Sequence, residues 1–147
     1  MPDLIVTEAP EGPDREACYA IRNAVFCIEQ GVGTEIEFDG LDADCRHYLA
    51  RRGDTAVGTA RVRPLDGDTA KIERVAVLGP WRGRDIGLAL MERTLRDAAA
   101  AGHRDALIYA QTHAAPFYRK VGFTEEGEGF MEAGIPHIRM RCVLAAR

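Results

Sequence analysis

The stretch that decides the fold reads Ile72-Glu73-Arg74-Val75-Ala76-Val77-Leu78-Gly79-Pro80-Trp81-Arg82-Gly83-Arg84-Asp85-Ile86-Gly87-Leu88-Ala89-Leu90. An apolar strand runs into a loop rich in Gly and Arg, which opens directly into an amphipathic helix. Unpaired N–H groups and the positive end of the helix dipole favour an anion there. Gly83 and Gly87 allow close approach to the backbone, and Arg82 and Arg84 add charge. We therefore expect a pyrophosphate site, with an ordinary helix start and solvated arginines as the alternative.

The rest of the chain predicts one α/β (α+β) domain over residues 1–147, in which helices cover a mixed sheet. The turns Arg52-Gly53-Asp54 and Leu65-Asp66-Gly67-Asp68 between the three central strands favour an antiparallel meander. Residues 29–44 read as a loop. The expected strands are 4–7, 45–51, 55–63, 69–78, 106–110 and a final pair within 123–141, and the expected helices are 13–31, 86–102 and 113–121.

Composition excludes several classes of function. The chain has 147 residues, 29% of them charged, and a formal net charge of −4, which argues against nucleic acid as the main partner. No apolar run is long enough to span a membrane, and the first residues lack the basic start of a signal peptide, so we expect a cytoplasmic protein. The 4 cysteines form no Cys-x-x-Cys pair, so we expect no metal site and no redox pair.

Two blocks of sequence resemble the motifs of one family, the GNAT superfamily of acyl-CoA-dependent N-acyltransferases. Val75-x-Val77, Pro80 and Arg82-x-x-Asp85-x-Gly87 are similar to its Arg/Gln-x-x-Gly-x-Gly/Ala motif, which follows a strand. Gln111-x-x-Ala114-x-x-Phe117-Tyr118-Arg119-Lys120-Val121-Gly122-Phe123 resembles its Asn-x-x-Ala-x-x-Leu/Phe-Tyr-x-Lys-x-Gly-Phe motif. Residues 25–30, 72–77 and 134–137 are further similar to the ElaA-like branch.

The resemblance implies a mixed, mostly antiparallel sheet that splays open at the acyl-CoA site. It implies acetyl-CoA as co-substrate, with backbone groups of Val75 and Val77 bonded to its pantetheine arm. Two residues depart from the motifs: Asp85 replaces the central Gly, and Gln111 replaces Asn. Asp85 either caps the helix or pairs with a neighbouring arginine, or it repels the pyrophosphate. The expected cofactor-binding residues are Val75, Val77, Arg82, Gly83, Arg84, Asp85, Ile86, Gly87, Gln111, Phe117 and Tyr118.

Acyl transfer to an amine needs a base for the ammonium and an acid for the departing thiolate. Tyr118 matches the family's tyrosine, which the resemblance implies is the general acid. Glu73 shares a strand face with Val75, and burial there would raise its pKa toward that of a base. The alternative for Glu73 is a cross-strand ion pair with an arginine. The other candidate bases are Glu29, Glu128 and His137, a histidine in a turn before the last strand.

Charge along the chain is uneven and suggests where the acceptor binds. Residues 1–50 carry 11 acidic and 3 basic side chains, and residues 51–147 carry 12 acidic and 16 basic ones. The stretch 29–44 holds six of those acids, and in the family this segment lines the acceptor side. We expect a negative rim that attracts a small-molecule or peptide amine of cationic character, with a solvated acidic loop as the alternative.

Two functions from different classes fit these observations. The first is an N-acetyltransferase that moves an acetyl group from acetyl-CoA to a primary amine by direct attack in a ternary complex. The second is a non-catalytic acyl-CoA-binding sensor or adaptor. A covalent mechanism through Cys45-x-His47 is a further alternative, since alternate strand residues share a face and a thiolate beside an imidazole is a nucleophile. A homodimer is one option for the assembly.

Overall fold

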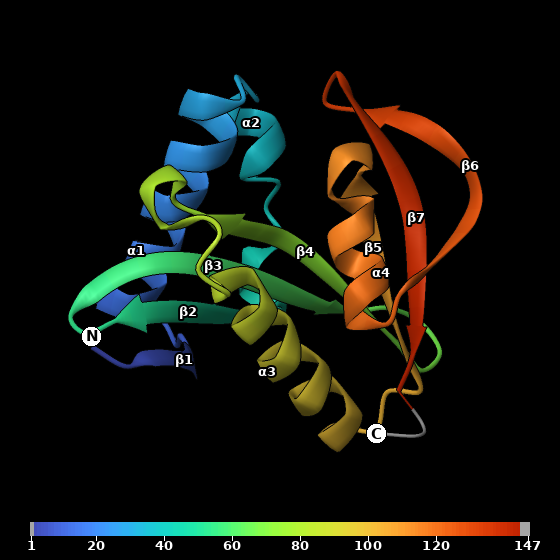
Figure 1. Cartoon of the computed structure of the whole chain (residues 1–147), viewed down its shortest axis with the longest axis horizontal. Coiled ribbons are helices and arrows are strands. Elements are labelled where there is room, and N and C mark those ends of the chain that lie inside the picture. The colour runs from blue at the N-terminus through green and yellow to red at the C-terminus, as the bar shows by residue number, and fades with distance from the viewer. Residues whose placement is uncertain (1, 145–147) are drawn as a thin grey trace.

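A seven-stranded sheet with the order β1-β2-β3-β4-β5-β7-β6 organises the computed structural model, which describes residues 2–144 (Figure 1). Every neighbouring pair is antiparallel except β4 and β5, which are parallel. This confirms the predicted mixed, mostly antiparallel sheet. The strands are β1 (Leu4–Glu8), β2 (Arg46–Arg52), β3 (Thr55–Pro64), β4 (Thr69–Val77), β5 (Asp105–Gln111), β6 (Thr124–Glu132) and β7 (Ile135–Val143).

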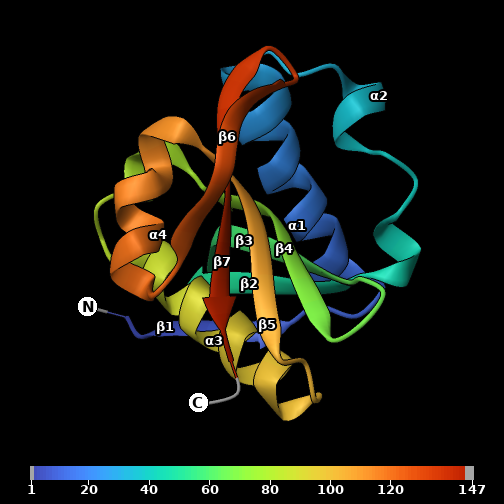
Figure 2. The same cartoon turned by 90° about the vertical axis from the view of Figure 1, so that its right-hand side faces the viewer.

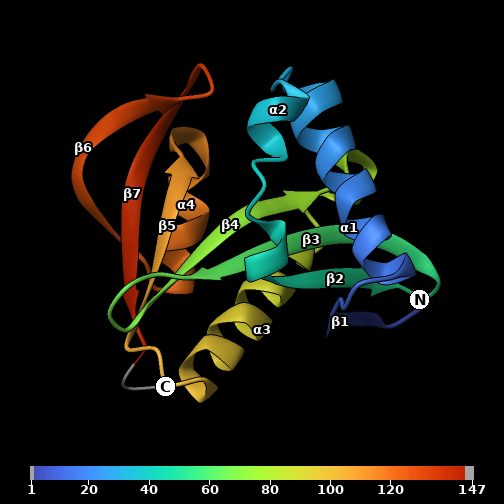
Figure 3. The same cartoon turned by 180° about the vertical axis from the view of Figure 1, so that it is seen from behind.

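Helices cover both faces of this sheet. Helix α1 (Pro13–Arg22), which continues as the π-helix η1 (Asn23–Glu29), packs on one face. Helices α3 (Ile86–Ala100) and α4 (Ala115–Val121) pack on the other, as the front and back views show (Figures 1 and 3). Among residues 2–144, no helix is long and apolar enough to cross a membrane.

The predicted loop 29–44 is wrong in part, because it contains the short helix α2 (Thr34–Glu37) and the 3-10 turn Asp42–Asp44. Hydrogen bonds from Ile36 and Glu37 to the Gly33 carbonyl start α2. Helix α2, the C-terminal end of α1 and the tip of the β6–β7 hairpin all lie at one end of the molecule (Figure 2).

The core follows from the alternation of strand residues. Tyr48 and Ala50 of β2 belong to the larger apolar cluster with α3 and α4, whereas Leu49 between them packs with Cys18 and Ile21 of α1. All five side chains are buried. The sheet is therefore packed on both faces, and it supports the loops at its open end.

The sheet splits between β4 and β5. Their pairing runs only from Thr69 opposite Asp105 to Ile72 opposite Ile108, although β4 continues to Val77 and β5 to Gln111. The β3–β4 register also shifts, because the segment of β4 between two paired positions is one residue longer than the facing segment of β3. Arg74 lies in this longer segment and has a φ of 56°. Such a bulge bends a strand and increases its twist. The last part of β4 consequently diverges from β5 (Figure 3).

Candidate functional site

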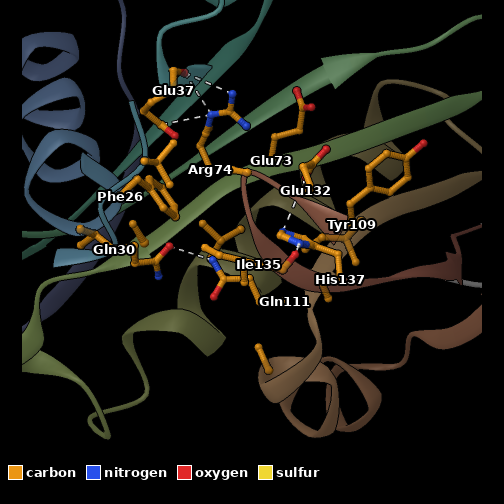
Figure 4. Close-up of a pocket in the computed structure, with 18 of the residues that line it drawn as sticks. Phe26, Gln30, Glu37, Glu73, Arg74, Tyr109, Gln111, Glu132, Ile135 and His137 are labelled. Atoms are coloured by element: carbon orange, nitrogen blue, oxygen red, sulfur yellow. Dashed lines mark hydrogen bonds and ion pairs between the residues drawn. The ribbon is translucent and has the colours of Figure 1, made fainter. Parts of the chain in front are cut away.

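A cavity of about 580 Å³ opens at the split between β4 and β5. Its walls come from β4, the end of β5, η1, α2, the start of α4 and the tip of the β6–β7 hairpin (Figure 4). Eight residues predicted for the site line it: Glu29, Glu73, Val75, Val77, Arg82, Gln111, Tyr118 and His137. Gly83, Arg84, Asp85, Ile86, Gly87, Phe117 and Glu128 are not among the lining residues, although the first five stand in the adjoining loop and helix start.

The loop between β4 and α3 ends at Asp85, the N-cap residue of α3. Asp85 has φ 61° and ψ 16°, a left-handed conformation that glycine adopts more readily than other residues. This explains why a glycine is usual at this motif position. Its carboxylate makes no capping hydrogen bond. The expectation of a side-chain cap is therefore wrong.

Gly87 lies in the first turn of α3, where it faces Phe117 of α4. A Cβ at Gly87 would lie 3.4 Å from Cζ of Phe117, an ordinary van der Waals contact, so packing does not require a glycine here. Ile86, at 1% exposure, is a core residue whose side chain packs inside. Only the backbone N–H groups of this turn can serve a ligand.

Arg82 is already held by other groups of the protein. Its Nε donates to the Val77 carbonyl at 2.9 Å, and its Nη1 and Nη2 donate to the two Glu29 carboxylate oxygens at 2.7 and 2.8 Å. These bonds lower the pKa of Glu29, which makes Glu29 a poor base candidate. The Arg84 guanidinium stacks over the Trp81 ring at 5.2 Å. A bound pyrophosphate would have to share Arg82 with Glu29.

Tyr118 lies in the first turn of α4, and its side chain is buried between Phe117 and Phe123. It lines the cavity on the side of the split that faces β5. Burial raises the pKa of Tyr118, so the phenol keeps its proton at neutral pH. A protonated hydroxyl at this place can donate a proton to an adjacent anion.

Glu73 does not have the raised pKa that the sequence predicted. It accepts hydrogen bonds from Arg61 at 2.8 Å and from Arg63 at 2.9 and 3.2 Å, and Nζ of Lys71 is 3.2 Å away. Burial alone would raise the pKa of Glu73, but these cations lower it to about 2. The alternative interpretation, a cross-strand ion pair, is therefore correct, and Glu73 is a poor general base.

His137 is placed to accept a proton in the cavity. It belongs to β7 rather than to a turn, opposite Phe130 of β6 and Gln111 of β5, and its side chain is 8% exposed. Its Nδ1 is 2.7 Å from the Ile135 carbonyl, and since a carbonyl oxygen only accepts, Nδ1 carries the proton. In the neutral ring Nε2 then has the free lone pair, 3.6 Å from the Glu132 carboxylate (Figure 4). Phe130 stacks on the imidazole at 5.8 Å and fixes its plane.

The acidic stretch does not form the predicted negative rim. Arg22 contacts Glu37 at 2.9 Å and Asp42 at 2.7 Å, and Arg61 contacts Asp39 at 3.0 Å. Arg74 contacts both Glu37 and Asp39, at 3.1 and 3.2 Å, and Arg82 holds Glu29. Sequence alone could not show this pairing, because three of these arginines lie far along the chain from the acids. Four of the six carboxylates are thus neutralised.

The covalent alternative fails on geometry. The Cys45 thiol donates to the Leu41 carbonyl at 3.2 Å, and Nε2 of His47 is 2.9 Å from the Asp42 carbonyl. Burial raises the pKa of Cys45 and lowers the pKa of His47, which opposes a thiolate–imidazolium pair. Neither residue is among those that line the cavity.

Two residues of the cavity, Gln30 and Glu132, carried no sequence signal that predicted their contacts. Gln30 accepts a hydrogen bond at 2.9 Å from the Gln111 side chain across the mouth of the split. Glu132 approaches His137 from the hairpin tip, where Ala133 and Gly134 have φ of 50° and 75°. Two positive φ angles in a two-residue hairpin turn indicate type I′.

Comparisons with known proteins agree with this geometry. A family model described as an acetyltransferase (GNAT) domain matches residues 22–144. The uncharacterized N-acetyltransferase YjcF of Bacillus subtilis is 38% identical over 127 residues, which cover 86% of this chain and 89% of YjcF. Protein ElaA of Escherichia coli is 37% identical over 129 residues, 84% of each chain.

Solved structures show the same architecture. The crystal structure of E. coli ElaA superposes with a TM-score of 0.80 and 30% identity over 95% of this chain and 99% of that one. A GNAT family acetyltransferase from Elizabethkingia anophelis, solved with acetyl-CoA bound, has a TM-score of 0.76 and 18% identity over 96% and 98% of the two chains. The second similarity concerns the fold alone.

Proposed function

Because the chain belongs to the GNAT acetyltransferase family, we propose that it is an N-acetyltransferase that moves an acetyl group from acetyl-CoA to a primary amine. The amine attacks the thioester directly while both substrates are bound. One observation carries the proposal: the unpaired end of β4, Tyr118 and the free lone pair of His137 all meet in one cavity. Acyl transfer needs a backbone cradle, an acid and a base in that arrangement.

The residues present fit an acyl-CoA. Within residues 2–144, the β4 backbone beyond Ile72 has no partner strand on its β5 side, so Val75 and Val77 can bond an extended pantetheine arm as an added strand would. The loop that follows β4 leads to the N-terminus of the 15-residue helix α3, whose first N–H groups suit a pyrophosphate. A backbone N–H of the diverging β4 segment also suits the oxyanion that forms on the thioester carbonyl.

His137 is the base in this proposal, in place of Glu73. Nε2 of His137 first takes one proton from the bound ammonium and passes it to solvent. As the amine nitrogen then bonds to the thioester carbon, Nε2 takes the second N–H proton, directly or through a water molecule. The Nδ1–H bond to the Ile135 carbonyl keeps the ring in the tautomer that can accept it. Glu132 faces the imidazolium that results and stabilises its charge.

Tyr118 is the acid. When the carbon–sulfur bond breaks, the electron pair stays on sulfur, and the Tyr118 hydroxyl gives its proton to the thiolate. The products are an amide and CoA thiol, and solvent restores the proton of Tyr118. The Tyr118 hydroxyl is protonated before transfer, because burial raises its pKa.

The experiment is a measurement of CoA thiol release when purified protein is mixed with acetyl-CoA and a broad panel of amines, with mass analysis of the product. We expect thiol release that depends on one class of amine, together with an acetylated amine. Binding of acetyl-CoA without amine-dependent release from any member of the panel would favour the sensor or adaptor function. A His137→Gln variant that kept full turnover would remove His137 as the base.

A further inference from the structure

The ion pairs beside the cavity leave an excess of positive charge on its β3–β4 side. Five cations contact four carboxylates in one connected network, which therefore carries one net positive charge. The pKa of Glu37 is raised by burial, and its protonation would only increase the excess. The cations are Arg22, Arg61, Arg63, Lys71 and Arg74, and the carboxylates are Glu37, Asp39, Asp42 and Glu73.

Three of these cations line the cavity, Arg63, Lys71 and Arg74, and both Lys71 and Arg63 keep donors for a ligand. Lys71 has three N–H donors. In the part of the chain that the structure describes, its one carboxylate contact is with Glu73 at 3.2 Å, and its Nζ lies 3.7 Å from the centre of the Tyr109 ring. Arg63 bonds Glu73 through Nε and Nη2, which leaves Nη1 outside these bonds. The side chains of Lys71 and Arg63 are 11% and 27% exposed.

The hairpin side of the same cavity carries the opposite charge. The Glu132 carboxylate is 48% exposed, and among the described residues its one ion-pair contact is His137. The two sides are connected through aromatic rings, because Tyr109 meets Phe130 edge to face at 5.2 Å and Phe130 stacks on His137. Donors of Lys71 and Arg63 on one side and the Glu132 carboxylate beside the base on the other thus face one cavity. The members of the network that line it are three cations and three carboxylates.

From this arrangement we infer that the acceptor is an aminocarboxylate, a primary amine that also carries a carboxylate group. The ammonium is drawn to Glu132 and loses its proton to His137, while the carboxylate lies toward Lys71 and Arg63. A polyamine or another dication would place its second ammonium against the excess of cations. The inference rests on the proposed function, and it replaces the cationic acceptor that the acidic stretch suggested.

Matched substrates test the charge without changing the shape. Aminocarboxylates of increasing length, from glycine and β-alanine to 4-aminobutyrate, together with the larger α-amino acids, are each compared with the corresponding carboxamide and with a diamine of similar length. The readout is kcat/KM from CoA thiol release. We expect at least one aminocarboxylate to exceed its carboxamide by about tenfold or more, as for a charge-assisted hydrogen bond, and diamines to be the poorest.

A pair of variants locates the effect. Lys71→Met removes the charge from the cavity side of Tyr109. It should lower the ratio between kcat/KM for an aminocarboxylate and kcat/KM for the corresponding carboxamide to about the value of an uncharged site. Arg139→Met is the matched control, because Arg139 lies 5.5 Å from the centre of the same ring, is 47% exposed and does not line the cavity. The ratio compares two substrates on one protein sample, so partial unfolding of a variant does not change it.

Binding separates this inference from the proposed function. The same ligands are titrated by calorimetry or saturation-transfer NMR into wild-type protein loaded with CoA. Carboxylate-selective binding without acetylation would contradict the proposed function. It would still support the inference that the cavity selects a ligand with a carboxylate group. Three results would each overturn the inference. They are acetylation of amines with no preference for the carboxylate, a preference that survives in Lys71→Met, and the absence of aminocarboxylate binding.

Discussion

Replacement of Glu73 by Gln tests whether this carboxylate supports the fold or performs chemistry. Glu73 lies opposite Arg61 in the β3–β4 register and joins Arg61, Arg63 and Lys71 in one cluster. Its side chain is only 9% exposed. Gln keeps the size and one acceptor oxygen but removes the charge, so the change isolates the electrostatic contribution.

The magnitude follows from linkage. The pKa of Glu73 is lowered from 4.5 to about 2 in the folded protein. At about 1.4 kcal/mol per pKa unit, this difference stabilises the folded state by about 3 kcal/mol at neutral pH. Because the folded pKa is the lower one, the contribution is fully present above pH 4.5 and is lost as the pH falls toward 2. For a chain of this size the change in Tm is roughly 6 to 12 °C.

The assay is chemical unfolding of wild-type and Glu73→Gln protein at several pH values, together with turnover at a temperature at which both are folded. We expect the difference in unfolding free energy to be largest at neutral pH and to shrink in acid. Turnover should change far less than loss of a base would require, about a hundredfold or more. A stable Glu73→Gln protein with turnover lower by that factor would refute the assignment and restore Glu73 as the base.

Three other predictions address the site. Tyr118→Phe should lower kcat by about a hundredfold with little change in acetyl-CoA affinity, and an unchanged kcat would remove Tyr118 as the acid. Asp85→Gly relieves the strain of a left-handed backbone and removes a negative charge near the expected pyrophosphate. Calorimetry should therefore show acetyl-CoA binding that is about fivefold tighter, and weaker binding would contradict this prediction. Cys45→Ala should retain turnover because Cys45 does not line the cavity, and lost turnover in a folded variant would revive the covalent route.

The fold could be predicted from the sequence because its signals are local. Alternating apolar residues, tight turns with glycine and a strand–loop–helix motif each act within a few residues. The sheet built from them is mixed and mostly antiparallel, as predicted. The short helix at Thr34–Glu37 was missed because four residues carry no periodicity. Val75 and Val77 of β4 and Tyr118 of α4 line the cavity at the split, and the roles that the family resemblance implies for them stay predictions.

The electrostatics of the site could not be predicted, because they depend on contacts between residues far apart in the chain. Glu73 looked like a base with a raised pKa until Arg61 and Arg63 were placed beside it. The acids of residues 29–44 looked free until Arg22 and Arg74 reached them. A pKa depends on these distances, and sequence separation says little about them.

Initial-rate kinetics of CoA thiol release, with acetyl-CoA and an accepted amine both varied, tests the central claim most directly. Direct attack in a ternary complex at the split between β4 and β5 predicts double-reciprocal lines that intersect, with no thiol released before the amine is added. Parallel lines, with a burst of thiol from acetyl-CoA alone, would show an acetylated enzyme intermediate and contradict the account.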